Sequence, residues 1–342
     1  AREIRRGAWR CTRMHLAARL FSAVACVLSA LPCASAAPLA PRQVIQESLP
    51  SADEPWRLDR ALRTPPWFTV SGQVQARYES LSDRLVPLVD GENHGAFTRV
   101  LLLMTLRDRF LEATAEVIDA RASALPADAF PTDGQVNAAE LQQGYVAGHF
   151  SDSFRAGDSL RVLVGRFTMD IGSRRLVARN RYRNTINAFT GLDALWRSES
   201  GVQVRAFYTH PVVRLPQTGE TERLRNNEVQ FDEARSGRQL WGLFTSMPAF
   251  GRSDLAEVYC YGLFEDDSRA LLTRDRNLTT FGSRWTRPAI RGGFDWEVEA
   301  AYQTGRSSRF LSAANERLAH SASFVHASAG YTFGSAMRPR LE

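Results

Sequence analysis

Residues 293–303 read Gly-Phe-Asp-Trp-Glu-Val-Glu-Ala-Ala-Tyr-Gln, and their alternation sets the fold class. Apolar side chains such as Phe294 and Val298 occupy one phase of a two-residue period, whereas the carboxylates Glu297 and Glu299 occupy the other. Successive side chains of a β-strand point to opposite faces, so a period of two indicates a strand and not a helix. The stretch therefore predicts a β-strand with one apolar and one polar face.

The same alternation recurs along most of the chain. It is clearest in residues 69–79, 97–107, 111–121 and 202–209. Further strands are expected at residues 139–150, 159–170, 189–198, 238–247, 254–265, 276–286 and 319–333. Together with the stretch quoted first, these segments predict about twelve strands.

The segments between the strands alternate between long and short. Long connections are expected at about residues 82–96, 122–138, 171–188, 214–237, 266–275 and 306–318, with tight turns between the other strand ends. This alternation is typical of outer-membrane barrels, whose long loops lie outside and whose short turns face the periplasm. We therefore predict an all-β fold, an antiparallel transmembrane β-barrel of the outer-membrane porin type. An exported soluble β protein that binds glycans is an alternative, because a β-sandwich also alternates.

The first 36 residues have the pattern of an export signal. Three Arg residues surround the start of the apolar run 20–28, and residues 34–36 read Ala-Ser-Ala, which fits the rule for signal cleavage. Met14 is a candidate start, which would make residues 1–13 an upstream extension. We therefore expect residues 1–36 to be a signal peptide and the mature chain to be exported.

Composition and charge narrow the function further. Residues 37–65 are rich in proline and are expected to form a periplasmic leader, which leaves residues 66–342 for the barrel domain. All 43 basic residues are Arg, and the net charge of +6 is concentrated in residues 1–36, which hold six Arg and one Glu. Because the rest of the chain is nearly neutral, we expect no nucleic-acid partner.

One part of the chain carries a family resemblance. Residues 164–177 read Val-Gly-Arg-Phe-Thr-Met-Asp-Ile-Gly-Ser-Arg-Arg-Leu-Val, and residues 189–192 read Phe-Thr-Gly-Leu. Together with the strand 139–146 and the late run 327–333, these motifs resemble the alginate export family of outer-membrane porins. The resemblance extends in the same order over about residues 67–342.

The resemblance implies passive export of an anionic, alginate-like polysaccharide through an Arg-lined lumen in the outer membrane of a Gram-negative cell. It implies three kinds of partner: the anionic polysaccharide, outer-membrane lipid and periplasmic export partners. Barrels of the family have about eighteen strands, so the chain is expected to hold about twelve of a probable eighteen and to be truncated at its C-terminus. Family members usually place Asp where this chain has Thr190, which removes one expected charge.

The candidate pore-lining residues combine Arg with nearby carboxylates. Guanidinium groups stay charged and bind carboxylates bidentately, which suits a polyuronate, and a ring of Arg makes a water-filled lumen anion-selective. Arg166 and Arg175 are carried over from the family motif, three further Arg come from polar strand phases, and one comes from the 171–188 loop. The nearby carboxylates are expected to keep the Arg side chains extended and to moderate their affinity for the polymer. The full set is Arg166, Arg175, Arg77, Arg99, Arg205, Arg179, Asp170, Asp193, Glu112 and Glu116. Each Arg could equally be solvated or paired with an acid, and the loop could fold inward or face water.

Other function classes find little support. A porin for small anions or organic acids is the alternative within the same architecture. We predict no enzymatic activity, because the spacing of His320 and Ser321 is not diagnostic of a lipase. Cys260 is the one Cys after the signal, and the His residues form no metal-ligand pattern, so we expect neither a metal site nor a cofactor.

Overall fold

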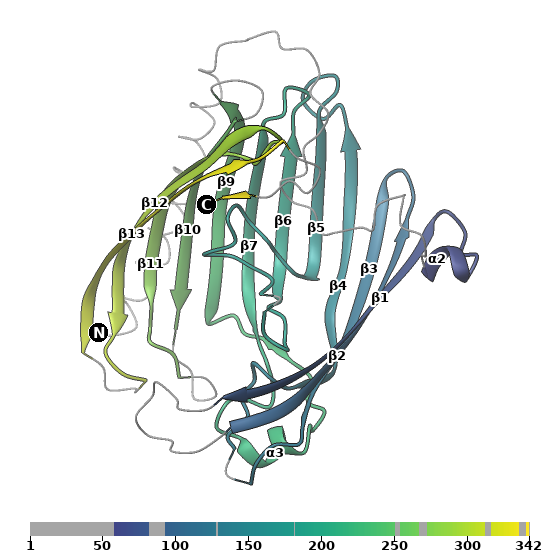
Figure 1. The fold of residues 1–342 in the computed structure, drawn as a ribbon, viewed down its shortest axis with the longest axis vertical. Coiled ribbons are helices and arrows are strands. Elements are labelled where there is room, and N and C mark those ends of the chain that lie inside the picture. The colour runs from purple at the N-terminus through teal and green to yellow at the C-terminus, as the bar shows by residue number, and fades with distance from the viewer. Residues whose placement is uncertain are drawn as a thin grey trace, which may run out of the picture. The chain divides into compact units, whose positions relative to one another are not determined.

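The structure is a computed structural model (Figure 1). It describes residues 58–81, 93–127, 129–180, 182–249, 254–266, 272–311, 316–334 and 340–341. The expected signal peptide and most of the expected leader lie outside the described residues. All described strands belong to one compact unit of the chain, residues 39–342.

The described residues form strands and two short helices. The strands are β1 (Phe68–Leu81), β2 (Asn93–Arg107), β3 (Leu111–Ser123), β4 (Asn137–Ser151), β5 (Ser159–Phe167), β6 (Phe189–Arg197), β7 (Gln203–Val213), β8 (Glu233–Ala234), β9 (Arg238–Ala249), β10 (Asp254–Glu265), β11 (Asn277–Arg287), β12 (Gly293–Ser308), β13 (Arg317–Thr332) and β14 (Arg340–Leu341). The helices are α2 (Leu58–Ala61) and α3 (Thr221–Arg225). No helix within the described ranges is long and apolar enough to cross a membrane.

The strands form one antiparallel sheet in which sequence neighbours are also spatial neighbours. The order runs from β1 to β7 and then from β9 to β14, while β8 pairs with the end of β7. Twelve of these strands have nine residues or more and coincide with the twelve predicted segments, so the predicted all-β antiparallel fold is confirmed. The elements β8, β14, α2 and α3 carry no sequence signal because they are too short to show a period.

Strand ends differ from the prediction by a few residues, and one difference has a clear cause. The prediction placed a strand at residues 159–170, but β5 ends at Phe167. The backbone N–H of Thr168 donates to the side-chain oxygen of Gln143 on β4 (3.0 Å) instead of to a neighbouring strand. A side chain has replaced the ladder at this point, so the chain leaves the sheet.

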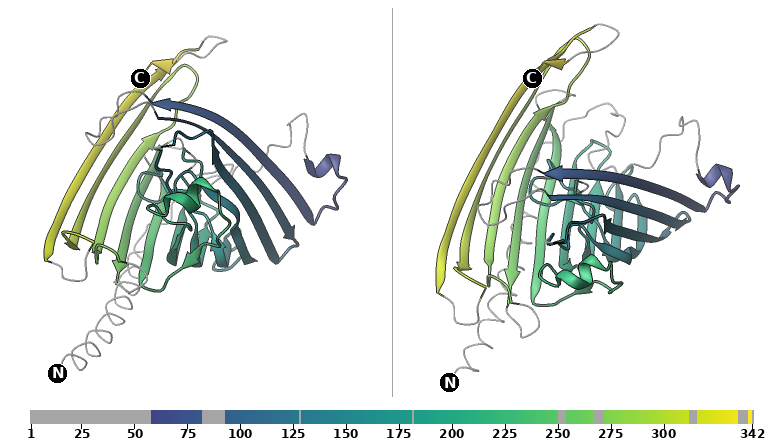
Figure 2. Two further views of the ribbon diagram at one scale, coloured as in Figure 1. Left: turned by 90° about the horizontal axis from the view of Figure 1, so that it is seen from below. Right: turned by 60° about the horizontal axis from the view of Figure 1, so that its bottom comes forward.

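The sheet is strongly curved, and connections from its long-loop end lie on the concave side (Figure 2). The connection after β5 reaches both flanks of the sheet, because its Arg179 pairs with Glu116 on β3 and its Arg175 pairs with Glu297 on β12. These two strands are eight steps apart in the sheet order. Among the residues described, β1 pairs with β2 alone, so the two outer edges of the sheet are not joined.

Burial along the strands is the reverse of that in a soluble sheet. In β3, Glu112, Thr114 and Glu116 are buried, whereas Leu111 and Val117 are 59% and 38% exposed. Other long strands expose large apolar side chains in the same way: Val74, Val100, Val146, Val164, Leu192, Tyr208, Val258, Phe281, Phe294, Val298 and Val325. Soluble proteins rarely expose so much contiguous apolar surface, whereas a sheet that meets lipid does so on every strand.

Two glycines of the family motifs allow β5 to approach β4 closely and β6 to approach β7 closely. Gly165 and Gly191 lie opposite each other in the register, with φ of +136° and +159°. A Cβ atom on Gly165 would lie 2.4 Å from the carbonyl oxygen of Gly144, and one on Gly191 would lie 2.2 Å from that of Tyr208. No other residue fits either position without displacing backbone, which explains why both motifs carry Gly.

Candidate functional site

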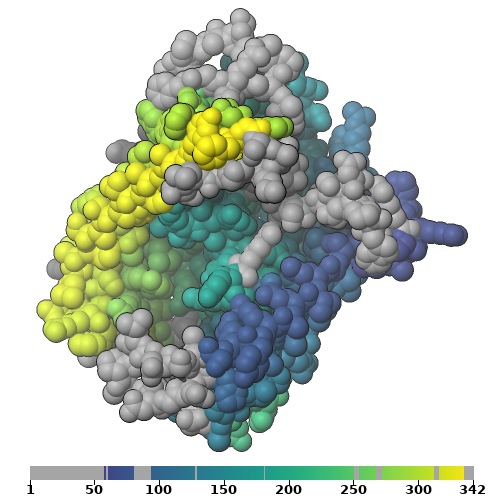
Figure 3. Space-filling view, in the orientation of Figure 1, coloured from purple at the N-terminus to yellow at the C-terminus, as the bar shows by residue number. Residues whose placement is uncertain are grey.

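The concave side of the sheet carries charged side chains that pair with one another. We call the inward-pointing side chains of the long strands the polar face. Its buried charged members on the strands include Arg99, Glu112, Glu116, Glu140, Asp193, Arg205, Glu257 and Glu299. Figure 3 shows this side hollowed between β13, in yellow, and β1 and β2, in purple and blue. Charges are buried at low cost only when they are paired, so the arrangement of partners decides what this surface can do.

Residues 168–180 and 182–188, the described part of the connection from β5 to β6, lie across the polar face, and we call them the inner segment. Arg179 donates to Glu116 on β3 (2.6 Å), and its backbone N–H donates to Asp170 (2.8 Å). Arg99 on β2 donates to the carbonyl oxygen of Arg183 (2.9 Å). The loop whose direction the sequence left open therefore turns inward.

The far flank of the sheet holds the other end of the inner segment. Arg175 bonds Glu297 (2.8 Å between Nη1 and Oε1) and also bonds Glu299, both on β12. On the same flank, Arg284 of β11 bonds Glu257 (2.9 Å) and Glu297 (2.5 Å). Three carboxylates and two guanidinium groups thus form one network that joins β10, β11 and β12 to the inner segment.

Apolar packing also fixes the inner segment. Met169, Ile171 and Val177 are at most 4% exposed and belong to one buried cluster with Phe244 of β9 and Tyr259 of β10. Such contacts do not depend on salt or pH, whereas exposed ion pairs do. The inner segment is therefore held in a fixed position on the polar face by apolar packing as well as by ion pairs.

A second connection, between β7 and β8, is anchored to the wall at Asp232. Its carboxylate accepts the backbone N–H of Leu215 and the side-chain amide of Asn137, both at 2.9 Å. Its own backbone N–H donates to Glu140 (2.7 Å), and Glu140 also pairs with Arg166 (2.6 Å). Burial raises the pKa of Asp232 from 3.8 to about 6, and the negative charge of Glu140 adds to the rise. The hydrogen bond from Leu215 acts in the opposite direction but is the weaker effect.

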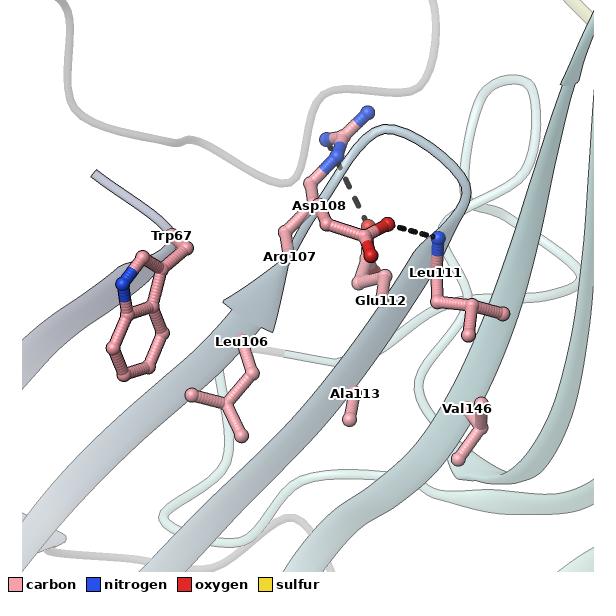
Figure 4. A pocket seen from close by; sticks show the side chains of 8 residues that line it. All are labelled: Trp67, Leu106, Arg107, Asp108, Leu111, Glu112, Ala113 and Val146. Carbon is pink, nitrogen blue, oxygen red and sulfur yellow. Dashed lines mark hydrogen bonds and ion pairs between the residues drawn. The ribbon is translucent and has the colours of Figure 1, made fainter. Parts of the chain in front are cut away.

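The tight-turn end of the sheet carries its own ion pairs. Glu112 on β3 pairs with Arg161 on β5 (2.8 Å) and with Arg107 on β2 (3.7 Å). Figure 4 shows Arg107 extending toward Glu112, while the carboxylate of Asp108 accepts the backbone N–H of Leu111 (2.8 Å) and closes the turn. Two backbone hydrogen bonds lower the pKa of Asp108, because they favour the charged carboxylate.

The ten candidate residues from the sequence all have bonded partners. Arg77 donates to the carbonyl oxygen of Tyr182 in the inner segment (2.8 Å), and Arg205 pairs with Asp193 (2.5 Å). Arg166 shares the phase of the exposed Val164, but it follows Gly165 with its positive φ, and its guanidinium turns to Glu140. No candidate Arg is an isolated cation.

Sequence reasoning missed four acidic partners and two cations. Those residues are Glu140, Glu257, Glu297, Glu299, Arg161 and Arg284. The polar phase of the stretch quoted first already contained two of them, so a search for acids as well as Arg in that phase would have found them. In the part of the chain that the structure describes, no three His, Cys, Asp or Glu side chains are grouped to hold a metal ion.

A curved antiparallel sheet with an exposed apolar outer face and a charged inner face is typical of membrane β-barrel proteins. The chain matches the alginate export family over residues 66–342, and it belongs to that family of outer-membrane β-barrels. The resemblance found in the sequence is thereby confirmed. A comparison with curated proteins finds no match.

Proposed function

We propose that the chain forms the wall of an outer-membrane channel for passive export of an anionic polysaccharide, a polyuronate of the alginate type. Family membership supports the substrate class. The observation that carries the proposal is the pairing of Arg with carboxylates on the polar face, as in Arg175 with Glu297 and Arg179 with Glu116. Because Arg stays charged, this surface can bind carboxylates at any physiological pH.

Weak, exchangeable binding follows from that pairing. A carboxylate of the polymer that approaches Arg175 must compete with Glu297 and Glu299, which already hold the guanidinium. The net gain is therefore smaller than at a free cation, and a bound sugar leaves readily. Conduction needs sites that are favourable enough to enter and weak enough to leave. The acidic partners thus serve transport by limiting affinity.

A channel for small anions or organic acids is the second candidate, and one observation favours it. The inner segment lies across the polar face and contacts both flanks of the sheet, which narrows the space for a wide polymer. An exported soluble protein fits less well, because the exposed Val74, Phe294 and Val325 (79%, 70% and 76%) would then lie in water.

The proposal also assigns the parts of the chain outside the sheet. Residues 1–36 direct export, residues 37–65 form a periplasmic leader, and the outer face of the sheet meets outer-membrane lipid. The tight turns would then face the periplasm, and the long connections would face outward. Periplasmic export partners would meet the tight-turn side.

The test is electrical recording of the full-length protein in planar bilayers. We expect anion selectivity and block by polyuronate added on the tight-turn side. Arg175→Gln should weaken the block, whereas Arg309→Gln, at an exposed pair with Glu316 near the long connections, should not. A cation-selective channel, or one indifferent to polyuronate, would remove the polysaccharide assignment. Passage of small organic anions without block by the polymer would establish the second candidate.

A further inference from the structure

Three Arg residues lie together on β5, β6 and β7 at the tight-turn end of the polar face. In the register, Leu195 of β6 lies opposite Arg161 of β5 on one side and Arg205 of β7 on the other. Arg197 lies two residues beyond Leu195 and therefore shares its face. Leu195 is buried, so this face is the inner one. The three side chains therefore lie on the same face of three neighbouring strands, at the tight-turn end of the sheet.

The pairing of these three cations is incomplete. Arg161 pairs with Glu112 (2.8 Å), and the Nε atom of Arg205 pairs with Asp193 (2.5 Å). The Nη1 atom of Arg205 is buried and has no hydrogen-bond partner among the described residues. Arg197 makes no hydrogen bond or ion pair with any described residue, although the charges of Arg161 and Arg205 act on it.

Another acid at this end of the sheet does not neutralise Arg197. Asp158 precedes Ser159, the residue opposite Arg197 in the register, and it is buried. Its carboxylate accepts the indole N–H of Trp196 (3.2 Å), and it makes no ion pair with Arg197 within the described ranges. Arg161 and Arg205 therefore each pair with a carboxylate, whereas Arg197 pairs with none among the described residues.

Such an arrangement is unfavourable unless an anion completes it. Like charges held close together repel, and a buried donor without a partner loses its hydration without compensation. A carboxylate between Arg197 and Arg205 would relieve both costs, because guanidinium forks bind carboxylates through two parallel hydrogen bonds. The other Arg residues of the polar face already have their partners, so this is the position at which a new carboxylate gains most.

We propose that Arg197, with Arg205 and Arg161 beside it, forms a binding site for the carboxylate of an acidic sugar at the tight-turn mouth. The inference rests on the proposed function for its biological sense, because the tight turns would face the periplasm from which the polymer enters. The site receives the first acidic sugar before the polymer reaches the inner segment. Whether the site exists can, however, be tested by measuring binding alone, without measuring transport.

The experiment is calorimetric titration of the full-length protein in detergent with galacturonate, its hexamer, and neutral galactose. The wild type should bind galacturonate and not galactose. Arg197→Gln should weaken galacturonate binding about tenfold or more, the expected effect of losing one charge-assisted pair. The matched control is Arg306→Gln. Arg306 lies near the C-terminal end of β12, is exposed, and makes no ion pair with any described residue.

Arg197→Lys keeps the charge but loses the guanidinium fork, so its affinity for galacturonate should lie between those of the wild type and Arg197→Gln, which separates loss of binding from loss of folding. Equal galacturonate affinity for Arg197→Gln and the wild type would overturn the site, and so would a wild type that binds no galacturonate. Tighter binding of the hexamer would support a polymer as the source of the carboxylate, and equal binding would support a single sugar acid. If galacturonate binds through Arg197 but polyuronate never blocks the channel, the site stands and the polysaccharide function fails.

Discussion

Glu116 on β3 shows how one residue of the polar face tolerates burial. It is 3% exposed, and its two carboxylate oxygens accept from Arg179 (2.6 Å) and from Gln143 (2.8 Å). Such a pair contributes little net stability, because each charge loses its hydration on folding. Removing one partner, however, leaves the other charge buried and uncompensated, which is far more costly.

We therefore expect Arg179→Met to lower the free energy of unfolding by about 3 kcal/mol, because Glu116 would stay charged and buried. The double variant Arg179→Met, Glu116→Gln should recover most of that loss. Urea titration of the protein in lipid vesicles, followed by tryptophan fluorescence, measures both. Arg223→Met is the control, because its pairs with Glu220 and Glu228 are exposed and should be worth less than about 1 kcal/mol. Similar losses at Arg179 and Arg223 would contradict the assignment.

Asp232 makes stability depend on pH in a direction that can be worked out. Its pKa is raised from 3.8 to about 6, so between these values the folded protein holds a proton that the unfolded chain has released. Stability contributed by this group is therefore present at low pH, falls as the pH rises from about 4 to about 6, and is level above that. Glu140 and Arg166 are the other charged groups near this carboxylate, and both are kept as wild type in the Asp232 variant described next.

Asp232→Asn should remove a fall in stability of about 2–3 kcal/mol between pH 4 and pH 7, since one unit of pKa difference corresponds to about 1.4 kcal/mol. The amide can still accept from Leu215, and it can donate to the Oδ1 atom of Asn137, which is a buried acceptor without a partner among the described residues. Urea midpoints at pH 4 and pH 7 give the measurement. Asp266→Asn, at an exposed position, is the control and should keep the fall. An unchanged fall in Asp232→Asn would show that another group carries it.

At the scale of elements, each long strand separates two environments one residue apart. On β1, Val74 is 79% exposed on the outer face, and its neighbour Gln73 points to the other face, where it is also exposed. The two residues pair with Val100 and Leu101 of β2, so they lie at the same height in the sheet. They form a natural pair for testing which face meets lipid.

Val74→Arg should lower the free energy of unfolding from vesicles by about 2–4 kcal/mol if this height is near the bilayer midplane. Gln73→Arg should change it by no more than about 0.5 kcal/mol, because an exposed side chain on the inner face keeps its contact with water. Equilibrium unfolding of both variants in the same vesicles makes the comparison. Equal tolerance at the two positions would contradict a lipid-facing outer surface.

At the scale of the whole sheet, the inner segment joins parts of the chain that are distant in sequence and in sheet order. Arg179 and Glu116 are 63 residues apart, and Arg175 and Glu297 are 122 residues apart. The packing of Ile171 and Val177 against Phe244 adds contacts with a third part of the sheet. Because these contacts share one segment, loss of the ion pair at one flank of the sheet is expected to weaken the contacts of the inner segment at the other flank.

The strands and their two faces follow from the sequence because alternation is a local property. Neighbours such as Val298 and Glu299 already differ in polarity, and the backbone of a strand sends them to opposite faces whatever else the chain does. The tight turns and the antiparallel order follow from the same local pattern. Recognition of the family also needed no tertiary information, since Gly165 and its neighbours form a continuous motif.

The partners of each charge came only with the folded sheet. The inward position of the inner segment is stabilised by contacts between residues 63 to 122 positions apart in the sequence. A local sequence pattern cannot predict such contacts. The unpaired state of Arg197 is a still clearer case, because it depends on where Asp193, Glu112 and Asp158 find their own partners. A strand pattern tells which face a charge is on, whereas only the packed sheet tells whether that charge is already neutralised.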